Sequence, residues 1–281
     1  MKPHTKQRIA FSFLFLCTLL VILPVGLILI IIIKNGLPAL SWQFLTDIPR
    51  AGMREGGIFP AIIGTFYLVL GAIIFALPIG VMCAIYLNEY TKENIFSRLI
   101  RLAIINLAGI PSVVYGLFGM ALFVMFFKFG TSILSGALTL GIMILPVIIT
   151  STQEALRSVP KEFREVSFSL GISKWQTIKR VVLPCAFPGI ITGAILGIGR
   201  AAGETAPLLF TVAAFYLPRL PRSIFDQVMA IPYHLYVIST QIPNIPEKIR
   251  YGTALVLVIL VLGINLFAII LRIKLRRKQR W

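Results

Sequence analysis

Long runs of uncharged, apolar residues dominate this sequence and limit what it can fold into. A helix needs about 20 residues to cross the hydrocarbon core of a bilayer, so runs of that length predict membrane-spanning helices. The runs occupy residues 9–33, 61–87, 102–127, 133–150, 185–216 and 251–271. We therefore expect an all-α membrane protein with about six transmembrane helices, in which residues 1–281 form a single transmembrane domain.

The low share of charged residues is typical of a membrane protein. They make up 13% of the chain, about half the share of an average soluble domain. A formal net charge of +17 also occurs in proteins that bind nucleic acid, but here the basic residues lie almost entirely between the apolar runs. We therefore expect the chain to contact a lipid bilayer and no nucleic acid.

The distribution of lysine and arginine predicts the orientation of the chain, because cytoplasmic connections are enriched in both. An even number of spans leaves both termini on the same side of the membrane. That side carries eighteen basic residues, six of them in the segment 154–184, whereas the opposite side carries eight. We expect both termini and the segment 154–184 to be cytoplasmic.

The residue types that form metal or catalytic sites are sparse. Cys17, Cys83 and Cys185 lie in or beside apolar runs without ligand spacing, and His4 and His234 are far apart in the sequence. No metal site is expected. The sequence also lacks a nucleophile motif, paired carboxylates and a GxxxxGK[ST] phosphate loop, so we expect neither an enzyme nor an ATP-binding chain.

The segment 154–184 has the pattern of two short amphipathic helices. Its first apolar stripe falls at helical spacing and consists of Leu156, Val159, Phe163, Val166 and Leu170. Gly171 suits the end of that helix, and Ser173 with Gln176 has the spacing of a capping box for a second one. Such a pair could enter a groove of another protein or lie on the lipid surface, and the pattern alone favours neither.

A resemblance to a known family bears on that choice. The segment resembles the EAA loop of bacterial ABC importer permeases, with Glu165, Gly171, Leu183 and Pro184 at the matching positions. Three positions depart from the family pattern but stay small or aliphatic: Val166, Ser167 and Val181. The resemblance implies that the loop docks into an ATP-binding subunit, with Trp175 among the coupling residues.

Two charges interrupt the fifth apolar run. Arg200 and Glu204 are four residues apart, so a continuous helix would place both on one face, together with Gly193, Gly197, Pro207 and Thr211. Gly199, Gly203 and Thr205 are the other candidate residues of this site. A charge at the bilayer centre costs about 3 kcal/mol or more and usually marks a pathway. The two residues could instead form a purely structural ion pair, but the arginine fork also suits two phosphate oxygens.

The order of four segments resembles the PstA-type phosphate permeases. These segments are GGIFPAIIGT at 56–65, GIPSVVYGLFG at 109–119, the 154–184 loop, and GRAAGETAP at 199–207. The resemblance implies a type I ABC importer bundle in a bacterial cell membrane, with cytoplasmic coupling helices. It also implies a second homologous permease subunit, two ATP-binding subunits that bind ATP and Mg²⁺, and an extracytoplasmic phosphate-binding protein.

Other functions remain open at this stage. Permeases for molybdate, tungstate or sulfate share the EAA loop, and a stand-alone channel would need no such loop. The outer connections 34–60 and 218–250 are rich in proline and hold seven of the eight outer basic residues, so we expect them to receive the binding protein.

Overall fold

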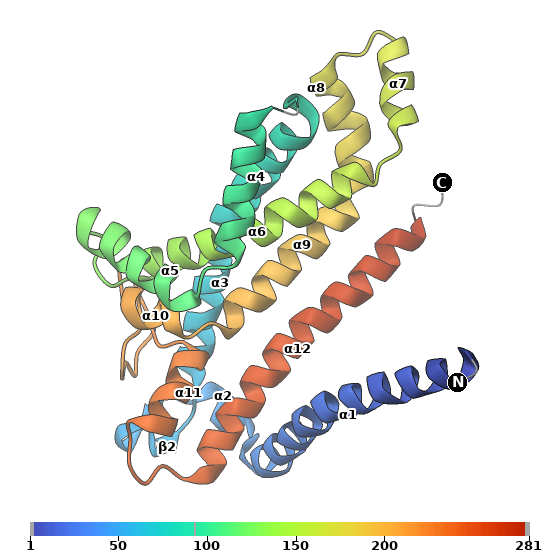
Figure 1. The fold of residues 1–281 in the computed structure, drawn as a ribbon. Coiled ribbons are helices and arrows are strands. Elements are labelled where there is room, and N and C mark those ends of the chain that lie inside the picture. The colour runs from blue at the N-terminus through green and yellow to red at the C-terminus, as the bar shows by residue number, and fades with distance from the viewer. Residues whose placement is uncertain (1–2, 93, 279–281) are drawn as a thin grey trace.

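Long helices make up most of the computed structural model, which describes residues 3–92 and 94–278. Among these residues, five helices are long and apolar enough to cross a bilayer, and one bent pair of helices provides a sixth candidate span. The five are α1 (Pro3–Gly36), α3 (Phe59–Ile85), α6 (Ile133–Arg157), α9 (Leu183–Gly203) and α12 (Glu247–Lys278). The prediction of an all-α chain with about six spans is confirmed (Figure 1).

The third predicted span is not a continuous helix. In place of one helix over 102–127, the chain forms α4 (Ile95–Ala108) and α5 (Ser112–Gly119), and its direction turns by 103° between α4 and the segment Ser112–Phe126. A π-helical turn, η4 (Met120–Phe126), continues α5. Pro111 explains the break, because a proline disfavours helical geometry in the residue before it and supplies no N–H.

The fifth predicted span also ends early. Helix α9 stops at Gly203, Glu204 has an extended backbone with ψ 136°, and a short helix α10 follows at Ala206–Thr211. The prediction of one helix over 185–216 is therefore wrong at its C-terminal end. Its beginning differs as well, because α8 (Lys174–Thr177) continues through the π-helical turn η5 (Ile178–Val182) into α9.

This continuity changes the predicted loop. Helix α7 (Lys161–Ser169) is the expected first amphipathic helix, but α8 is the first turn of a long helix rather than a separate short one. At the opposite end of the molecule lie short elements, shown near the bottom of Figure 1. They are η1 (Leu37–Ala39), α2 (Trp42–Thr46), the two-stranded β1 (Pro49–Arg50) and β2 (Glu55–Gly56), η2 (Ala51–Met53), and α11 (Ile231–Thr240).

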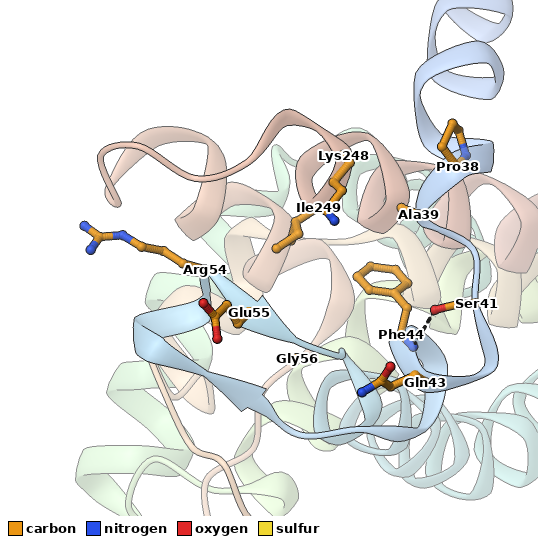
Figure 2. Close-up of a pocket in the computed structure, with 10 residues that line it drawn as sticks. All are labelled: Pro38, Ala39, Ser41, Gln43, Phe44, Arg54, Glu55, Gly56, Lys248 and Ile249. Carbon is orange, nitrogen blue, oxygen red and sulfur yellow. Dashed lines mark hydrogen bonds between the residues drawn. The ribbon is translucent and has the colours of Figure 1, made fainter.

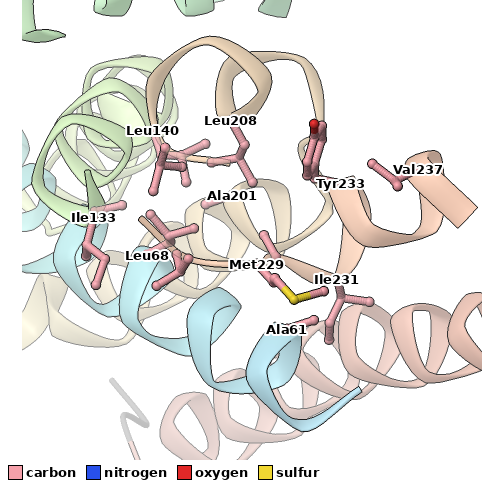
Figure 3. Packing of buried hydrophobic residues seen from close by; sticks show 14 of the residues in the cluster. Ala61, Leu68, Ile133, Leu140, Ala201, Leu208, Met229, Ile231, Tyr233 and Val237 are labelled. Atoms are coloured by element: carbon pink, nitrogen blue, oxygen red, sulfur yellow. The ribbon is translucent and has the colours of Figure 1, made fainter. Parts of the chain in front are cut away.

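The core of the bundle lies where α3, α6, α10 and α11 meet. Side chains from all four elements interlock there, as Leu68, Leu140, Leu208 and Ile231 illustrate in Figure 3. Small residues allow the helices to approach closely, because a Cβ added at Gly71 would lie 2.7 Å from that of Ala137. Helices α3 and α6 consequently form a tightly packed pair.

Helix α1 stands apart from this bundle. It packs on α12 near Gly36, where an added Cβ would lie 2.6 Å from the Tyr251 carbonyl oxygen, and then diverges toward the N-terminus (Figure 1). No residue in the most apolar part of α1 is buried against the rest of the described structure. Two of the basic residues counted in the sequence, Lys2 and Arg280, lie outside the described residues.

Candidate functional site

Arg200 and Glu204 form an ion pair at the C-terminal end of α9. Arg200 Nε lies 3.6 Å from Glu204 Oε1, and the two side chains are 34% and 18% exposed. This distance exceeds a hydrogen bond, so the two groups attract each other without forming a bidentate clamp. The pair predicted from their spacing is present, but Glu204 lies just beyond the helix rather than within it.

The other residues predicted around this pair have different surroundings. Gly199 faces α12, where an added Cβ would lie 2.8 Å from Asn265 Oδ1, whereas a Cβ added at Gly203 would lie 3.8 Å from Val261 Cγ2. Thr205 precedes α10 and makes no side-chain cap hydrogen bond. The predicted helical face does not extend to Thr211, because that residue belongs to α10.

The spans are broken between α4 and α5 and between α9 and α10, and the two short helices that follow these breaks, α5 and α10, contact each other. Helix α5 packs on α10 at Gly116, where an added Cβ would lie 3.0 Å from Pro207 Cα. Tyr115 spans the first break, because its hydroxyl donates a 2.7 Å hydrogen bond to the Leu107 carbonyl oxygen. Non-helical backbone at membrane depth is tolerated where protein buries it or where it lines a polar cavity, so this region is the best candidate for a path.

The remaining motif segments serve packing. Gly64 of GGIFPAIIGT leaves no room for a Cβ against the Met229 carbonyl oxygen. Thr65 Oγ1 accepts a 2.9 Å hydrogen bond from the Ile231 backbone N–H. Gly119 of GIPSVVYGLFG lies equally close to Thr139. These residues set the distance between helices and contribute no charge to the candidate path.

The 154–184 loop turns sharply at Gly171. This glycine has φ +73°, a left-handed conformation that favours glycine, and it follows the end of α7 as predicted. Ser173 and Gln176 form the predicted capping box at the start of α8. Two buried hydroxyl groups, Ser167 Oγ and Thr177 Oγ1, lie 2.8 Å apart and join α7 to α8.

An apolar surface remains exposed on this loop. It is formed by Val166, Phe168, Leu170 and Trp175, of which Leu170 is 74% exposed. Glu165 and Pro184 are also exposed, whereas Leu183 packs against a cluster of buried residues that includes Leu156 and Val182. Some of the predicted coupling residues, such as Glu165 and Trp175, are therefore accessible to a partner, whereas Leu183 is packed against the helix bundle.

Sequence reasoning missed a second ion pair. Arg164 Nη2 donates a 2.8 Å hydrogen bond to Glu89 Oε1, and the side chains are only 16% and 8% exposed. Arg164 lies off the apolar stripe of α7, so the hydrophobic pattern gives no indication of its partner. No local signal relates the two residues, because 75 positions separate them in the sequence.

A cavity of about 280 Å³ lies at the end of the molecule opposite α7 (Figure 2). Its lining includes the basic residues Arg54 and Lys248 and the acidic Glu55. The Arg54 guanidinium points away from the cavity in Figure 2 and donates a 3.3 Å hydrogen bond to the Pro243 carbonyl oxygen. Both signs of charge are present, so this cavity has no clear preference for an anion.

Residues 76–281 match the protein family described as binding-protein-dependent transport system inner membrane component. The probable ABC transporter permease protein YqgI of Bacillus subtilis (strain 168) is 38% identical, with 95% of each chain covered. The phosphate transport system permease protein PstA of Mycobacterium leprae (strain TN) is also 38% identical. That match covers 99% of this chain and 92% of the relative.

The fold is shared with a chain in the crystal structure of a bacterial alginate ABC transporter in complex with a periplasmic protein. The TM-score is 0.68 at 15% sequence identity, and the match covers 94% of this chain and 93% of the other. At this identity the likeness concerns the fold alone. Together with the family match over residues 76–281, it confirms the predicted type I ABC importer permease bundle.

Proposed function

Because the chain belongs to the family of binding-protein-dependent transport system inner membrane components, we propose that it is a permease subunit of an ATP-driven importer of inorganic phosphate. In this proposal, the chain forms the translocation path together with a second, homologous permease. The observation that carries the substrate assignment is 38% identity to a phosphate permease over 99% of this chain. The chain is a transport component of a membrane and has no catalytic role of its own in the proposal.

The Arg200 region supports an anionic substrate. Arg200 lies where α9 ends, its side chain is one third exposed, and its only ion pair among the described residues is the 3.6 Å contact with Glu204. A planar guanidinium can donate two parallel hydrogen bonds to phosphate oxygens. We assign the substrate path to Arg200 and Glu204 together with Gly199, Gly203 and Thr205, which surround the end of the helix.

The 154–184 loop supports the energy-coupling part of the proposal. Its exposed apolar surface, Val166, Phe168, Leu170 and Trp175, is suited to a groove on an ATP-binding subunit. Two such subunits bind ATP and Mg²⁺, one for each permease. The loop and both termini are then cytoplasmic, while the end that carries α11 and β2 faces outward and receives a phosphate-binding protein.

Reconstitution of the four-subunit membrane complex in vesicles tests this function. We expect uptake of radioactive phosphate that requires ATP and the binding protein, with little competition from sulfate or molybdate. Uptake of molybdate or sulfate in preference to phosphate would assign the chain to another oxyanion. Ion conductance by this chain alone, without the other subunits, would favour a stand-alone channel.

A further inference from the structure

Arg164 of α7 and Glu89 of the π-helical turn η3 (Tyr86–Tyr90) form a two-pronged ion pair. Arg164 Nη2 lies 2.8 Å from Glu89 Oε1, and Arg164 Nε lies 3.3 Å from Glu89 Oε2. Both side chains are largely buried. Surface ion pairs contribute little because water screens them, but a buried and bidentate pair fixes the relative position of its two elements.

The same guanidinium also holds the corner between α6 and α7. Arg164 Nη2 donates a 2.9 Å hydrogen bond to the Leu156 carbonyl oxygen in the last turn of α6. Arg164 Nη1 donates to the carbonyl oxygens of Val159 at 2.9 Å and Pro160 at 3.4 Å. One side chain thus joins the cytoplasmic end of α3, the end of α6 and the start of α7.

Helix α7 has further neighbours in α8 and η5, and the hydroxyl pair of Ser167 and Thr177 ties it to α8. Its Phe163 packs against the buried cluster that includes Leu156 and Val182. Beside the ion pair lies an open cavity of about 420 Å³, which Glu165 and Phe168 of α7 also line. Arg164 is therefore a polar joint between the exposed helix α7 and the tightly packed spans α3 and α6.

We propose that Arg164 and Glu89 are positioning residues that carry the movement of α7 into α3 and α6 during the transport cycle. This inference rests on the proposed function, in which an ATP-binding subunit moves α7. A lysine at position 164 keeps the charge but has a single nitrogen, so it cannot hold the carboxylate and the three carbonyl oxygens together. A glutamine at position 89 keeps the shape of the acceptor but loses its charge.

The first experiment compares Arg164→Lys, Glu89→Gln and the control Arg98→Lys in the reconstituted complex. Arg98 is an exposed arginine of α4, so its replacement removes the same fork without touching the joint. We expect ATP hydrolysis near the wild-type rate in all three. Phosphate taken up per ATP should fall at least about tenfold in the first two variants, the ratio expected for losing one charge-assisted hydrogen bond, and stay unchanged in the control.

A second readout does not depend on the substrate. Spin labels at Ser169 on α7 and Met82 on α3 report the distance between these helices in the assembled complex with its native cysteines replaced. We expect one narrow distance distribution in the wild type and the Arg98→Lys control. A broader distribution in Arg164→Lys and Glu89→Gln, with and without bound ATP, would show that α7 moves independently of α3.

The inference is overturned if phosphate uptake and ATP hydrolysis fall in parallel, if the ratio stays at its wild-type value, or if the distance distribution stays narrow. Failure of both variants to copurify with the other subunits would make the pair a folding contact and would also overturn it. If only Arg164→Lys fails to assemble, Glu89→Gln decides. Absence of phosphate uptake by the wild-type complex would refute the proposed function, while the label distances would still test the joint.

Discussion

Ser167 Oγ on α7 and Thr177 Oγ1 on α8 lie 2.8 Å apart, on either side of the turn at Gly171. Both hydroxyl groups are buried, and the glycine between them has φ +73°. Two features therefore fix the angle between the two helices: the left-handed backbone conformation of Gly171 and the hydrogen bond between the two hydroxyl groups. This angle sets how the exposed surface of Val166, Leu170 and Trp175 meets a partner.

The first prediction concerns Gly171. Proline has a fixed φ of about −65°, so Gly171→Pro cannot keep the turn and should change the angle between α7 and α8. We expect the variant to insert and assemble but to hydrolyse ATP without transporting phosphate. The measurement is phosphate uptake per ATP in vesicles.

A graded series separates backbone conformation from bulk. The position is open, because among the described residues, its two chain neighbours aside, no atom lies within 4 Å of an added Cβ, so only the dihedral angle opposes a side chain. Asparagine tolerates the left-handed region, so Gly171→Asn should transport nearly normally. In Gly171→Ala, the left-handed conformation of the turn should be destabilised by about 1 kcal/mol of backbone strain. Normal transport by Gly171→Pro would show that the angle is not needed for coupling.

The second prediction concerns the pH dependence of stability. His234 of α11 is almost fully buried, and burial lowers its pKa from 6.5 to about 4. The unfolded chain therefore binds a proton at a higher pH than the folded one. The contribution of neutral His234 to stability is complete above pH 6.5 and is lost as the pH falls from about 6.5 toward 4, by about 1.4 kcal/mol per unit.

Thermal unfolding of the purified chain in detergent, measured from pH 8 to pH 4.5, checks this effect. His234→Leu cannot titrate and also removes the buried Nδ1, which has no hydrogen-bond partner among the described atoms. The difference in stability between wild type and variant should depend on pH below about 6.5 and be constant above it. A constant difference over the whole range would contradict the lowered pKa.

The third prediction concerns the outer connection 218–250. Arg219 and Arg222 are exposed, and the turn beside them is held by the backbone N–H groups of Arg222 and Ser223, which donate to Asp226 Oδ2 at 2.8 and 3.1 Å. Replacing both arginines by glutamate leaves these backbone donors in place. We expect weaker docking of the binding protein and a shallower dependence of that docking on salt.

Binding of the external protein to the reconstituted complex, measured over a salt series, checks this prediction. Arg98→Glu is the matched control, since it reverses an exposed arginine of α4 on the proposed cytoplasmic side. Its docking should equal that of the wild type at every salt concentration. Equal docking by the Arg219 and Arg222 variant would mean that these residues merely cap the bundle.

The parts of the fold that the sequence predicted are those set by local chemistry. The length of the uncharged run is enough to predict α6. The capping box at Ser173 and the end of α7 before Gly171 each depend only on residues that are neighbours in the sequence. The break before α5 has a local signal in Gly109 and Pro111, but the length of the uncharged run around it predicts one span.

The parts that the sequence did not predict depend on tertiary contacts. Helix α9 ends before Glu204 although the run of apolar residues continues, and α10 instead packs on α5. The partnership of Arg164 with Glu89 joins segments that no periodicity relates. For the Arg200 site, spacing alone predicted an ion pair, but not its position at the end of a helix.

The last prediction asks what Glu204 does beside Arg200 on the path of an anion. An ionised carboxylate repels phosphate, so Glu204 needs a compensating role. It could hold the Arg200 side chain in position, as the 3.6 Å contact suggests, or accept a hydrogen bond from the proton that monohydrogen phosphate carries and sulfate lacks. The first role requires only the charge of Glu204, whereas the second would discriminate between anions.

Transport in vesicles separates the two roles. The assay uses a variant complex that hydrolyses ATP without the external binding protein, so that the anion selectivity of the binding protein does not affect the result. Arg200→Lys keeps the charge but loses the fork and should reduce phosphate flux under either role while assembly persists. Glu204→Gln should reduce phosphate flux without admitting sulfate if Glu204 orients Arg200. We expect this result, because intramembrane charges commonly pair. A rise of sulfate relative to phosphate would instead support recognition of the proton. Wild-type flux in a double variant with alanine at both positions would reduce the pair to a structural contact.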